Sequence, residues 1–321
     1  MRPSSFAQFR RSLTAEGAEN RGGQEVTPGL CSCYAAAVAK KPSIAIAGPG
    51  RLGSALARAL ANAGYDVREV VSRGSSQMKS ELARALKARA TKTTTARLDS
   101  DLIWFCVPDR EIARAARALA SSTEWKGKIA LHSSGALTSD ELNVLRQRGA
   151  AVASVHPMMT FVHGSAPSLK GVLFAAEGDR RAVQAARGVV SRLGGELMLI
   201  AKKHKAAYHA WGTLLSPLLL SLLVTAEEVA RAAGMPRERA RRSAPPIVRQ
   251  TISNYVKLGP ERAFSGPLVR GDAAIVRRHL LMLAKIPEAK QVYAALAKAA
   301  LRYLPAENER ELRSALSRWS P

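Results

Sequence analysis

The most constraining feature of the sequence is a glycine-rich turn between an apolar run and an amphipathic segment. Residues 43–47 are apolar enough to form a buried strand, and residues 48–53, with the sequence GPGRLG, follow them directly. Alanine and leucine then recur at helical spacing up to Ala63, and Val67 to Val71 has the composition of a second strand. A strand, a glycine turn, a helix and a strand, in this order and within about 30 residues, predict a dinucleotide-binding unit.

Each glycine of this turn has its own expected role. Gly48 permits the tight turn, Gly50 lets the backbone approach a diphosphate, and Gly53 allows the helix to pack closely on the sheet. Arg51 and Leu52 occupy the first helical turn, whose N–H groups favour an anion. We expect these five residues to bind the cofactor; the alternative is a glycine turn without a ligand.

The end of the second strand bears on the choice between NAD and NADP. NAD-selective sites place Asp or Glu there, to bind the ribose 2′-hydroxyl. This chain has Ser72 and Arg73 instead, and Asp66 comes too early in the strand to serve. Arg73 can pair with a 2′-phosphate and Ser72 can donate a hydrogen bond to it, so the sequence predicts NADP. The alternative for Arg73 is a solvated arginine in an arginine-rich chain.

Further apolar runs alternate with helical segments along the first two thirds of the chain. They comprise residues 101–108, 128–132, 151–155, 172–176 and 197–200. This alternation predicts an α/β fold with a doubly wound parallel sheet. Because ligands bind beyond the carboxyl ends of such strands, we expect Val107 and Pro108 to contact the cofactor. By the same argument, Ser134 and His156 are candidates for substrate binding.

From about Ala201 the strand signals end and helical periodicity takes over. Residues 206–226 carry no charged side chain, and Pro217 is expected to kink or divide this long helix. We expect the helix to be buried between domains or between subunits rather than to span a membrane. Further helices are predicted to follow. They cover residues 227–233, 237–258, 272–284, 288–303 and 307–319.

The sequence therefore divides into three parts. Residues 1–41 lack periodicity and are expected to be a disordered extension or an over-long annotated start. Residues 42–200 form the expected dinucleotide-binding domain, and residues 201–321 form a helical domain for substrate binding and dimerisation. Cys31 and Cys33 are more consistent with two incidental thiols than with a zinc site, and we predict no metal. Three cysteines in all exclude a disulfide framework and fit a cytoplasmic protein.

The net charge of +24 raises nucleic acids, membrane surfaces and small anions as partners. Residues 1–41 hold six Lys and Arg against three Glu, so +21 belongs to the rest of the chain. The sequence contains no recognised nucleic-acid motif. We therefore predict a small anionic substrate, and neither nucleic acid nor membrane as a partner.

Several motifs follow one another in a specific order. They are residues 44–53, Val107-Pro108-Asp109, residues 132–137 (HSSGAL), 156–161 (HPMMTF), 205–209 (KAAYH) and 265–272 (SGPLVRGD). With them the chain resembles the Rossmann-like proteins that carry a C-terminal domain of unknown function, DUF2520. These are similar to 6-phosphogluconate dehydrogenase-like, pyrroline-5-carboxylate reductase-like and deazaflavin-dependent NADP oxidoreductases. The resemblance covers about residues 42–304.

This resemblance implies a Rossmann domain, a helical dimerisation domain and an active site in the cleft between them. In related hydroxyacid dehydrogenases, a lysine on the first helix after the sheet acts as the acid, and an asparagine follows four residues later. Lys205 and His209 have this spacing, with His in place of Asn, so either of them could be the acid, and Lys205 could instead hold a substrate carboxylate. The alternatives are a solvated Lys205 and a hydrogen-bonded core pair of Tyr208 and His209. For Arg270 and Asp272 two alternatives stay open: an exposed loop, or a loop that reaches the partner subunit's cleft, as the resemblance to dimeric relatives implies.

Together these features predict an NADP-dependent oxidoreductase. Its expected reaction is hydride transfer between the nicotinamide and a small keto- or imino-acid-like substrate, with Lys205 and His209 as catalytic candidates. The alternative is an NADP-binding regulatory or sensor protein without turnover. A deazaflavin as the hydride partner also stays open.

Overall fold

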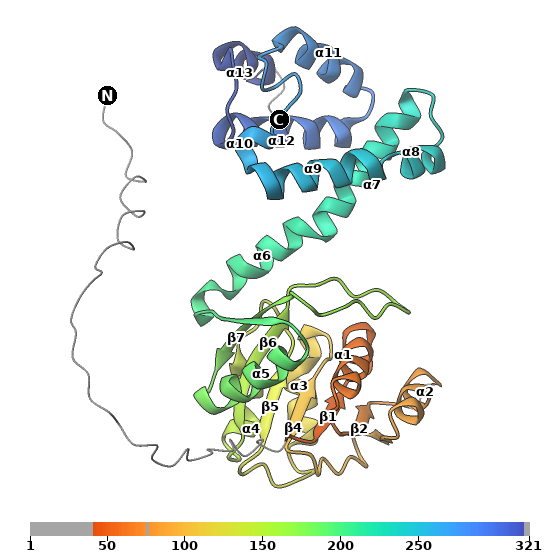
Figure 1. Ribbon diagram of the computed structural model, residues 1–321, viewed down its shortest axis with the longest axis vertical. Helices are drawn as coiled ribbons and strands as arrows, with labels where there is room; N and C mark the ends of the chain where they lie inside the picture. The colour runs from red at the N-terminus through yellow and green to blue at the C-terminus, as the bar shows by residue number, and fades with distance from the viewer. Residues whose placement is uncertain (1–40, 75–76, 318–321) are drawn as a thin grey trace, which may run out of the picture. The chain divides into compact units, whose positions relative to one another are not determined.

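The computed structural model describes residues 41–74 and 77–317, and Figure 1 shows their arrangement. The expectations for the N-terminal extension up to residue 40, including Cys31 and Cys33, lie outside the described residues.

Within the described residues, eight strands form one sheet in the order β3-β2-β1-β4-β5-β6-β7-β8. Their bounds are β1 Ile44–Ala47, β2 Val67–Ser72, β3 Arg89–Lys92, β4 Leu102–Phe105, β5 Ile129–His132, β6 Ala151–Pro157, β7 Leu173–Gly178 and β8 Glu196–Leu199. The first six pair in parallel, so their carboxyl ends meet along one edge of the sheet. The residues after β1, β2, β4, β5 and β6 therefore share this edge.

Helices cover both faces of the sheet. They are α1 Arg51–Asn62, α2 Gln77–Ala85, α3 Ile112–Leu119, α4 Asn143–Arg146 and α5 Arg180–Arg192, with the short 3-10 helices η1 Asp109–Glu111 and η2 Ser139–Leu142. Alternate strand residues point to opposite faces. Leu102 and Trp104 thus join the core under α1, α2 and α5, whereas Ile103 and Phe105 join the core under α3 and α4. Both faces of the sheet are closed by the chain itself.

The α/β fold agrees with the prediction, but the sheet is not parallel throughout. β7 runs antiparallel to β6, and β8 then pairs with β7 in parallel. A parallel neighbour requires a crossover connection, which is usually a helix. The connection over residues 158–172 contains no helix, so β7 returns beside β6 in the opposite direction. The edge strand β3, which is short and only half-buried, is absent from the prediction.

The C-terminal part is helical, as predicted. After η3 Lys202–His204, its helices are α6 Lys205–Leu215, α7 Pro217–Ala232, α8 Arg237–Ser243, α9 Pro245–Leu258, α10 Pro260–Ala263, α11 Ala273–Leu283, α12 Pro287–Tyr303 and α13 Glu309–Ser317. Pro217 divides the long helix at Ser216 as expected. The single helix predicted over 237–258 is also divided, because Pro245 begins a new helix. A core of residues from α11, α12 and α13 holds the end of this region together.

The long apolar helix is exposed within the single chain rather than buried between its domains. The stretch Lys202–Ala232 is long and apolar enough to cross a membrane by length and composition, and only 6% of its most apolar window is buried. Leu214 and Leu220 are 61% and 63% exposed. The prediction that this helix is buried between the domains of one chain is therefore wrong, and burial between subunits stays a prediction.

Candidate active site

The glycine turn between β1 and α1 has the close contacts that its sequence predicts. Gly48 has a φ of +99°, and a Cβ there would lie 2.6 Å from Val107 Cγ1. A Cβ on Gly53 would lie 2.1 Å from the carbonyl oxygen of Gly48, so packing requires glycine at both positions. A Cβ on Gly50, the N-cap of α1, would meet nothing within 4 Å. The turn is thus a cradle that is tight on its inner side and open at Gly50.

A pocket of about 360 Å³ lies at this cradle. Of the nine residues predicted to bind the cofactor, six line it. These are Gly48, Gly50, Ser72, Arg73, Val107 and Pro108. Gly53 is buried behind the turn, Leu52 packs against the core, and Arg51 is exposed in the first turn of α1 and lines a separate pocket. The ends of β1, β2 and β4 thus meet at one hollow.

The sequence interpretation missed three polar side chains of this pocket, those of Thr93, Glu111 and Arg114. The Arg73 guanidinium Nη1 lies 3.1 Å from Glu111 Oε2, and Arg114 Nη1 lies 3.9 Å from the same oxygen. Glu111 follows β4, the strand beside β1, so the shared carboxyl edge of the sheet was the signal that could have found it.

A second polar cluster lies at the same edge, after β5 and β6. The backbone N–H of Ser134 donates to His132 Nδ1 at 3.2 Å, which leaves the proton of the ring on Nε2, 2.9 Å from the carbonyl oxygen of Thr138. Burial lowers the pKa of His132 to about 4, so this imidazole is neutral at pH 7. His132 therefore holds the Ser134 loop and does not titrate near neutrality.

Ser134 is engaged on every side by the protein. Its hydroxyl donates to Asp109 Oδ2 at 2.8 Å and accepts the backbone N–H groups of Ala136 and Leu137 at 3.2 and 2.9 Å. Its carbonyl oxygen accepts the hydroxyl of Ser154 at 3.0 Å. These bonds fix the loop after β5.

Lys205, the first residue of α6, is fully buried. Its ammonium donates to the carbonyl oxygen of Ser134 at 3.1 Å and to Ser154 Oγ at 2.7 Å. Burial lowers the pKa of Lys205, while the carboxylates of Glu177 and Asp109 act in the opposite direction. Lys205 thus joins the first helix of the C-terminal region to the ends of β5 and β6.

His156, Tyr208 and His209 form a group of rings above Gly135. The Tyr208 hydroxyl lies 3.0 Å from His156 Nδ1, and the His156 and His209 ring centroids are 6.0 Å apart. A Cβ on Gly135 would lie 2.6 Å from His209 Cδ2, so only glycine leaves room for this ring. Burial first, and then His209 and Lys205, lower the pKa of His156 to about 4, and burial raises that of Tyr208 to about 12. His156 and Tyr208 are neutral at pH 7, and His209 is the exposed member.

The structure brings Ser134, His156, Lys205 and His209 together, but not Arg270. The guanidinium of Arg270 pairs with Asp272 Oδ2 at 3.1 Å within its own exposed loop before α11. Among the described residues, Asp272 is the ion-pair partner of this arginine, and no contact joins it to the histidines.

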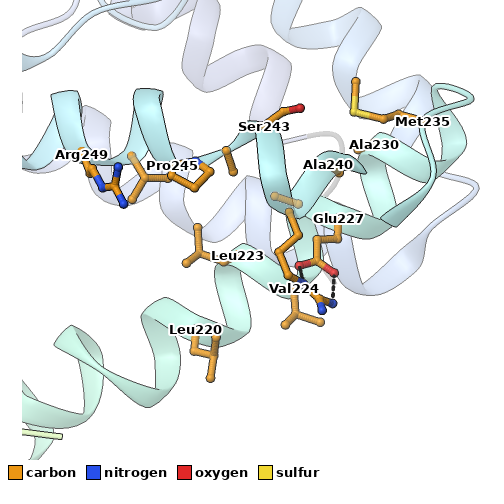
Figure 2. A pocket seen from close by; sticks show the side chains of 14 residues that line it. Leu220, Leu223, Val224, Glu227, Ala230, Met235, Ala240, Ser243, Pro245 and Arg249 are labelled. Atoms are coloured by element: carbon orange, nitrogen blue, oxygen red, sulfur yellow. Dashed lines mark hydrogen bonds and ion pairs between the residues drawn. The ribbon is translucent and has the colours of Figure 1, made fainter. Parts of the chain in front are cut away.

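A larger pocket, of about 830 Å³, lies between α7, α8 and α9 (Figure 2). Its wall is mainly apolar, and its buried carboxylate, Glu227, accepts two hydrogen bonds from Arg241 at 2.8 Å each. No predicted site residue lines it. Within residues 41–74 and 77–317, no group of three or more His, Cys, Asp and Glu side chains is arranged to hold a metal.

Two family models match the chain. A Rossmann-like domain covers residues 34–157, and the domain of unknown function DUF2520 covers residues 172–300. No curated protein matches it. These matches agree with the resemblance drawn from the motifs.

Solved structures share the fold. A Bacteroides fragilis protein assigned as an NADP oxidoreductase is 21% identical, with a TM-score of 0.69 over 81% of this chain and 97% of its own. A Thermotoga maritima protein is also 21% identical, with a TM-score of 0.63 over 86% and 98%. A reductive aminase from Aspergillus terreus, in complex with NADPH and ethyl-5-oxohexanoate, is 17% identical, with a TM-score of 0.59 over 86% and 99%.

Proposed function

The chain combines a Rossmann-like domain with a DUF2520 domain, and we propose that it is an NADP-dependent oxidoreductase. Its reaction is the transfer of a hydride between the nicotinamide and a small keto- or imino-acid-like substrate. The observation that carries this proposal is the cradle of Gly48, Gly50 and Gly53, which shares one edge of the sheet with His156 and His209. A nucleotide site and a proton-bearing cluster are thus reached from the same side.

The residues of the cradle fit a dinucleotide. Gly50 offers open backbone at the N-terminus of a 12-residue helix, where N–H groups and the helix dipole favour a diphosphate. Arg73 and Ser72 at the end of β2 are suited to a 2′-phosphate, and Val107 and Pro108 close the pocket from β4. The chemistry that NADPH supplies when bound is a hydride to the carbon of a C=O or C=N bond.

In this proposal His209 supplies the proton that the substrate oxygen or nitrogen needs. It is the exposed member of the ring cluster, so it can regain a proton from solvent after each turnover. The ring of the neutral His156 lies against it and is held by Tyr208, and in this proposal His156 orients His209. Gly135 leaves the space that the His209 ring occupies.

Lys205 has a positioning role in this proposal. Its ammonium is bound inside the fold by Ser134 and Ser154 and holds the loop after β5 against α6. Ser134 acts through the same loop, because its hydroxyl and carbonyl groups are both occupied by protein partners.

The substrate is proposed to be small and to carry a carbonyl or imine group. The ligands named with the Aspergillus terreus reductive aminase include two carbonyl compounds, ethyl-5-oxohexanoate and cyclohexanone, the second together with allyl amine, an amine that can condense with a ketone to an imine. A carboxylate on the substrate would find a cation in Arg270 if a partner subunit brought this exposed loop to the site.

A homodimer is the proposed assembly. α6 and α7 expose Trp211, Leu214 and Leu220, and α9 exposes Ile247 and Val256. Large apolar side chains exposed in this number on neighbouring helices favour a protein–protein contact. We place the dimer in the cytoplasm, where a reduced, buried thiol such as that of Cys106 is ordinary, without nucleic acid or membrane as a partner.

The test is a titration of NADPH into the full chain, followed by a screen of keto acids, ketones with amines, and cyclic imines for NADPH oxidation. We expect binding, and turnover of at least one class. The variant His209→Asn should lower kcat by roughly a hundredfold or more with NADPH binding retained, since it removes a positioned acid. Tight NADPH binding with no turnover of any compound would instead indicate a sensor.

A further inference from the structure

The nucleotide pocket contains a carboxylate, that of Glu111, which is distant in the sequence from Ser72 and Arg73. Glu111 belongs to η1, six residues beyond the end of β4, and its side chain lines the same pocket as Ser72 and Arg73. Its side chain is 18% exposed, against 70% for Arg73 and for Arg114. Glu111 is thus the most buried member of the group, and the two arginines are the exposed ones.

One glutamate oxygen serves both arginines. Arg73 Nη1 lies 3.1 Å from Glu111 Oε2, and Arg114 Nη1 lies 3.9 Å from it. A guanidinium has a limited set of N–H groups, and a carboxylate and a phosphate compete for the same planar fork. A 2′-phosphate that approaches Arg73 therefore meets a cation whose charge is already partly neutralised, and a second anion beside it.

A carboxylate at this place is also suited to bind a ribose 2′-hydroxyl. NAD-selective sites use an acidic side chain at the end of the second strand to bind the ribose 2′-hydroxyl. The end of β2 has Ser72 and Arg73 instead, but η1, which follows β4, supplies Glu111 to the same pocket. Groups suited to a 2′-hydroxyl and groups suited to a 2′-phosphate thus face one hollow.

We propose that Glu111 is a specificity-determining residue, which limits the preference of this pocket for a 2′-phosphate over a 2′-hydroxyl. It does so by holding Arg73 and Arg114 through its carboxylate and by repelling the phosphate. The inference rests on the proposed function, because it assumes that an adenine dinucleotide binds at the cradle. Its consequence is that the protein binds NAD as well as NADP, with only a modest difference between them.

The test uses fragments that contain only the adenosine end. Adenosine 2′,5′-bisphosphate and adenosine 5′-monophosphate are titrated by calorimetry into the full chain and into the variants Glu111→Gln, Arg73→Gln and Arg114→Gln. Glu111→Gln should raise the affinity ratio of bisphosphate to monophosphate by about two- to fivefold, the range of partly exposed ion pairs. Arg73→Gln and Arg114→Gln should lower it. The matched control is Glu124→Gln, an exposed glutamate outside the pocket that changes the net charge equally and should leave the ratio unchanged.

An unchanged or lowered ratio in Glu111→Gln would overturn the inference, because the carboxylate would then be neutral toward the phosphate or would help to bind it. The intact dinucleotides separate this failure from that of the proposed function. If the unaltered protein binds neither NADP nor NAD, the function itself is wrong; if it binds both and Glu111→Gln leaves their affinity ratio as it was, only the role of Glu111 is wrong.

Discussion

The sheet region and the helical region treat their apolar side chains in opposite ways. The sheet buries them on both faces under helices that come from the same chain. In the helical region a core forms among α11, α12 and α13, while α6, α7 and α9 leave large apolar side chains exposed. The first region is complete by itself, and the second keeps surface for a contact that the single chain does not provide.

The candidate site follows the same division. The cradle and its pocket come entirely from the sheet region, whereas Lys205, Tyr208 and His209 come from the first helix of the helical region. Lys205 joins the two through Ser134 and Ser154. Nucleotide binding should therefore tolerate damage to the helices, but turnover should not.

The largest effect is expected inside the cradle. Gly53→Ala places a Cβ 2.1 Å from the carbonyl oxygen of Gly48, so the turn or α1 must shift, at a cost of about 1–3 kcal/mol or more. Gly50→Ala is the matched control, because its Cβ meets nothing within 4 Å. It should keep the melting temperature and lose NADPH affinity. Equal melting temperatures in the two variants, measured by circular dichroism, would contradict the packing account.

A second effect is expected from acid. The pKa values of His132 and His156 are lowered to about 4, while those of unfolded histidines lie near ~6.5. Below pH 6.5 these histidines bind protons in the unfolded chain but stay neutral in the folded chain, so the free energy of unfolding falls between pH 6.5 and 4. For the fully buried His132 the loss is on the order of 3 kcal/mol.

Denaturant unfolding at steps from pH 7 to pH 4 measures this loss. His132→Asn should make the free energy of unfolding less dependent on pH in this window. Replacement of the exposed His163 by Asn is the control and should leave the slope as it is. A flat profile for the unaltered protein would refute the neutral, buried imidazoles.

A third effect should be confined to the helical region. Leu220 is 63% exposed on α7, and Leu220→Glu should weaken self-association by roughly tenfold or more, because burying a charge in an apolar contact is unfavourable. Val162→Glu, at a 55% exposed position of the sheet region, is the control and should leave association unchanged. Analytical ultracentrifugation measures the self-association of both variants and of the unaltered protein. A monomeric unaltered protein would contradict the proposed dimer.

The smallest effect compares two similar hydrogen bonds. Tyr208 lies 3.0 Å from His156 Nδ1 in the site, and Tyr293 lies 3.1 Å from His279 Nδ1 in the helical core. Replacement of either tyrosine by Phe should cost about 1 kcal/mol of stability. Only Tyr208→Phe should also lower kcat or change its pH profile. The same kinetics in both variants would mean that Tyr208 is merely structural.

The sequence predicted local features well and non-local ones poorly. The glycine cradle and the division at Pro217 depend on residues adjacent in the chain, and both were found. The antiparallel direction of β7 follows from the absence of a helix in the connection over residues 158–172. An absent helix is a weaker signal in a sequence than a motif. The edge strand β3 has too few buried positions to stand out.

The site shows the same limit. Spacing alone suggested that Lys205 and His209 lie on one side of a helix, but not that the Lys205 ammonium would be bound inside the fold and His209 exposed. The pairing of Arg73 with Glu111 joins residues 38 positions apart, which follow β2 and β4 on either side of β1. Such contacts are set by strand order, which periodicity does not reveal.

The most direct test of the central claim is isotope transfer from the cofactor. The full chain is incubated with NADPH that carries deuterium at C4 of the nicotinamide, on either face, and with a panel of carbonyl and imine compounds. We predict a reduced product one mass unit heavier for one of the two labelled faces, and a much slower reaction in His209→Asn. NADPH binding without deuterium in any product would contradict this prediction.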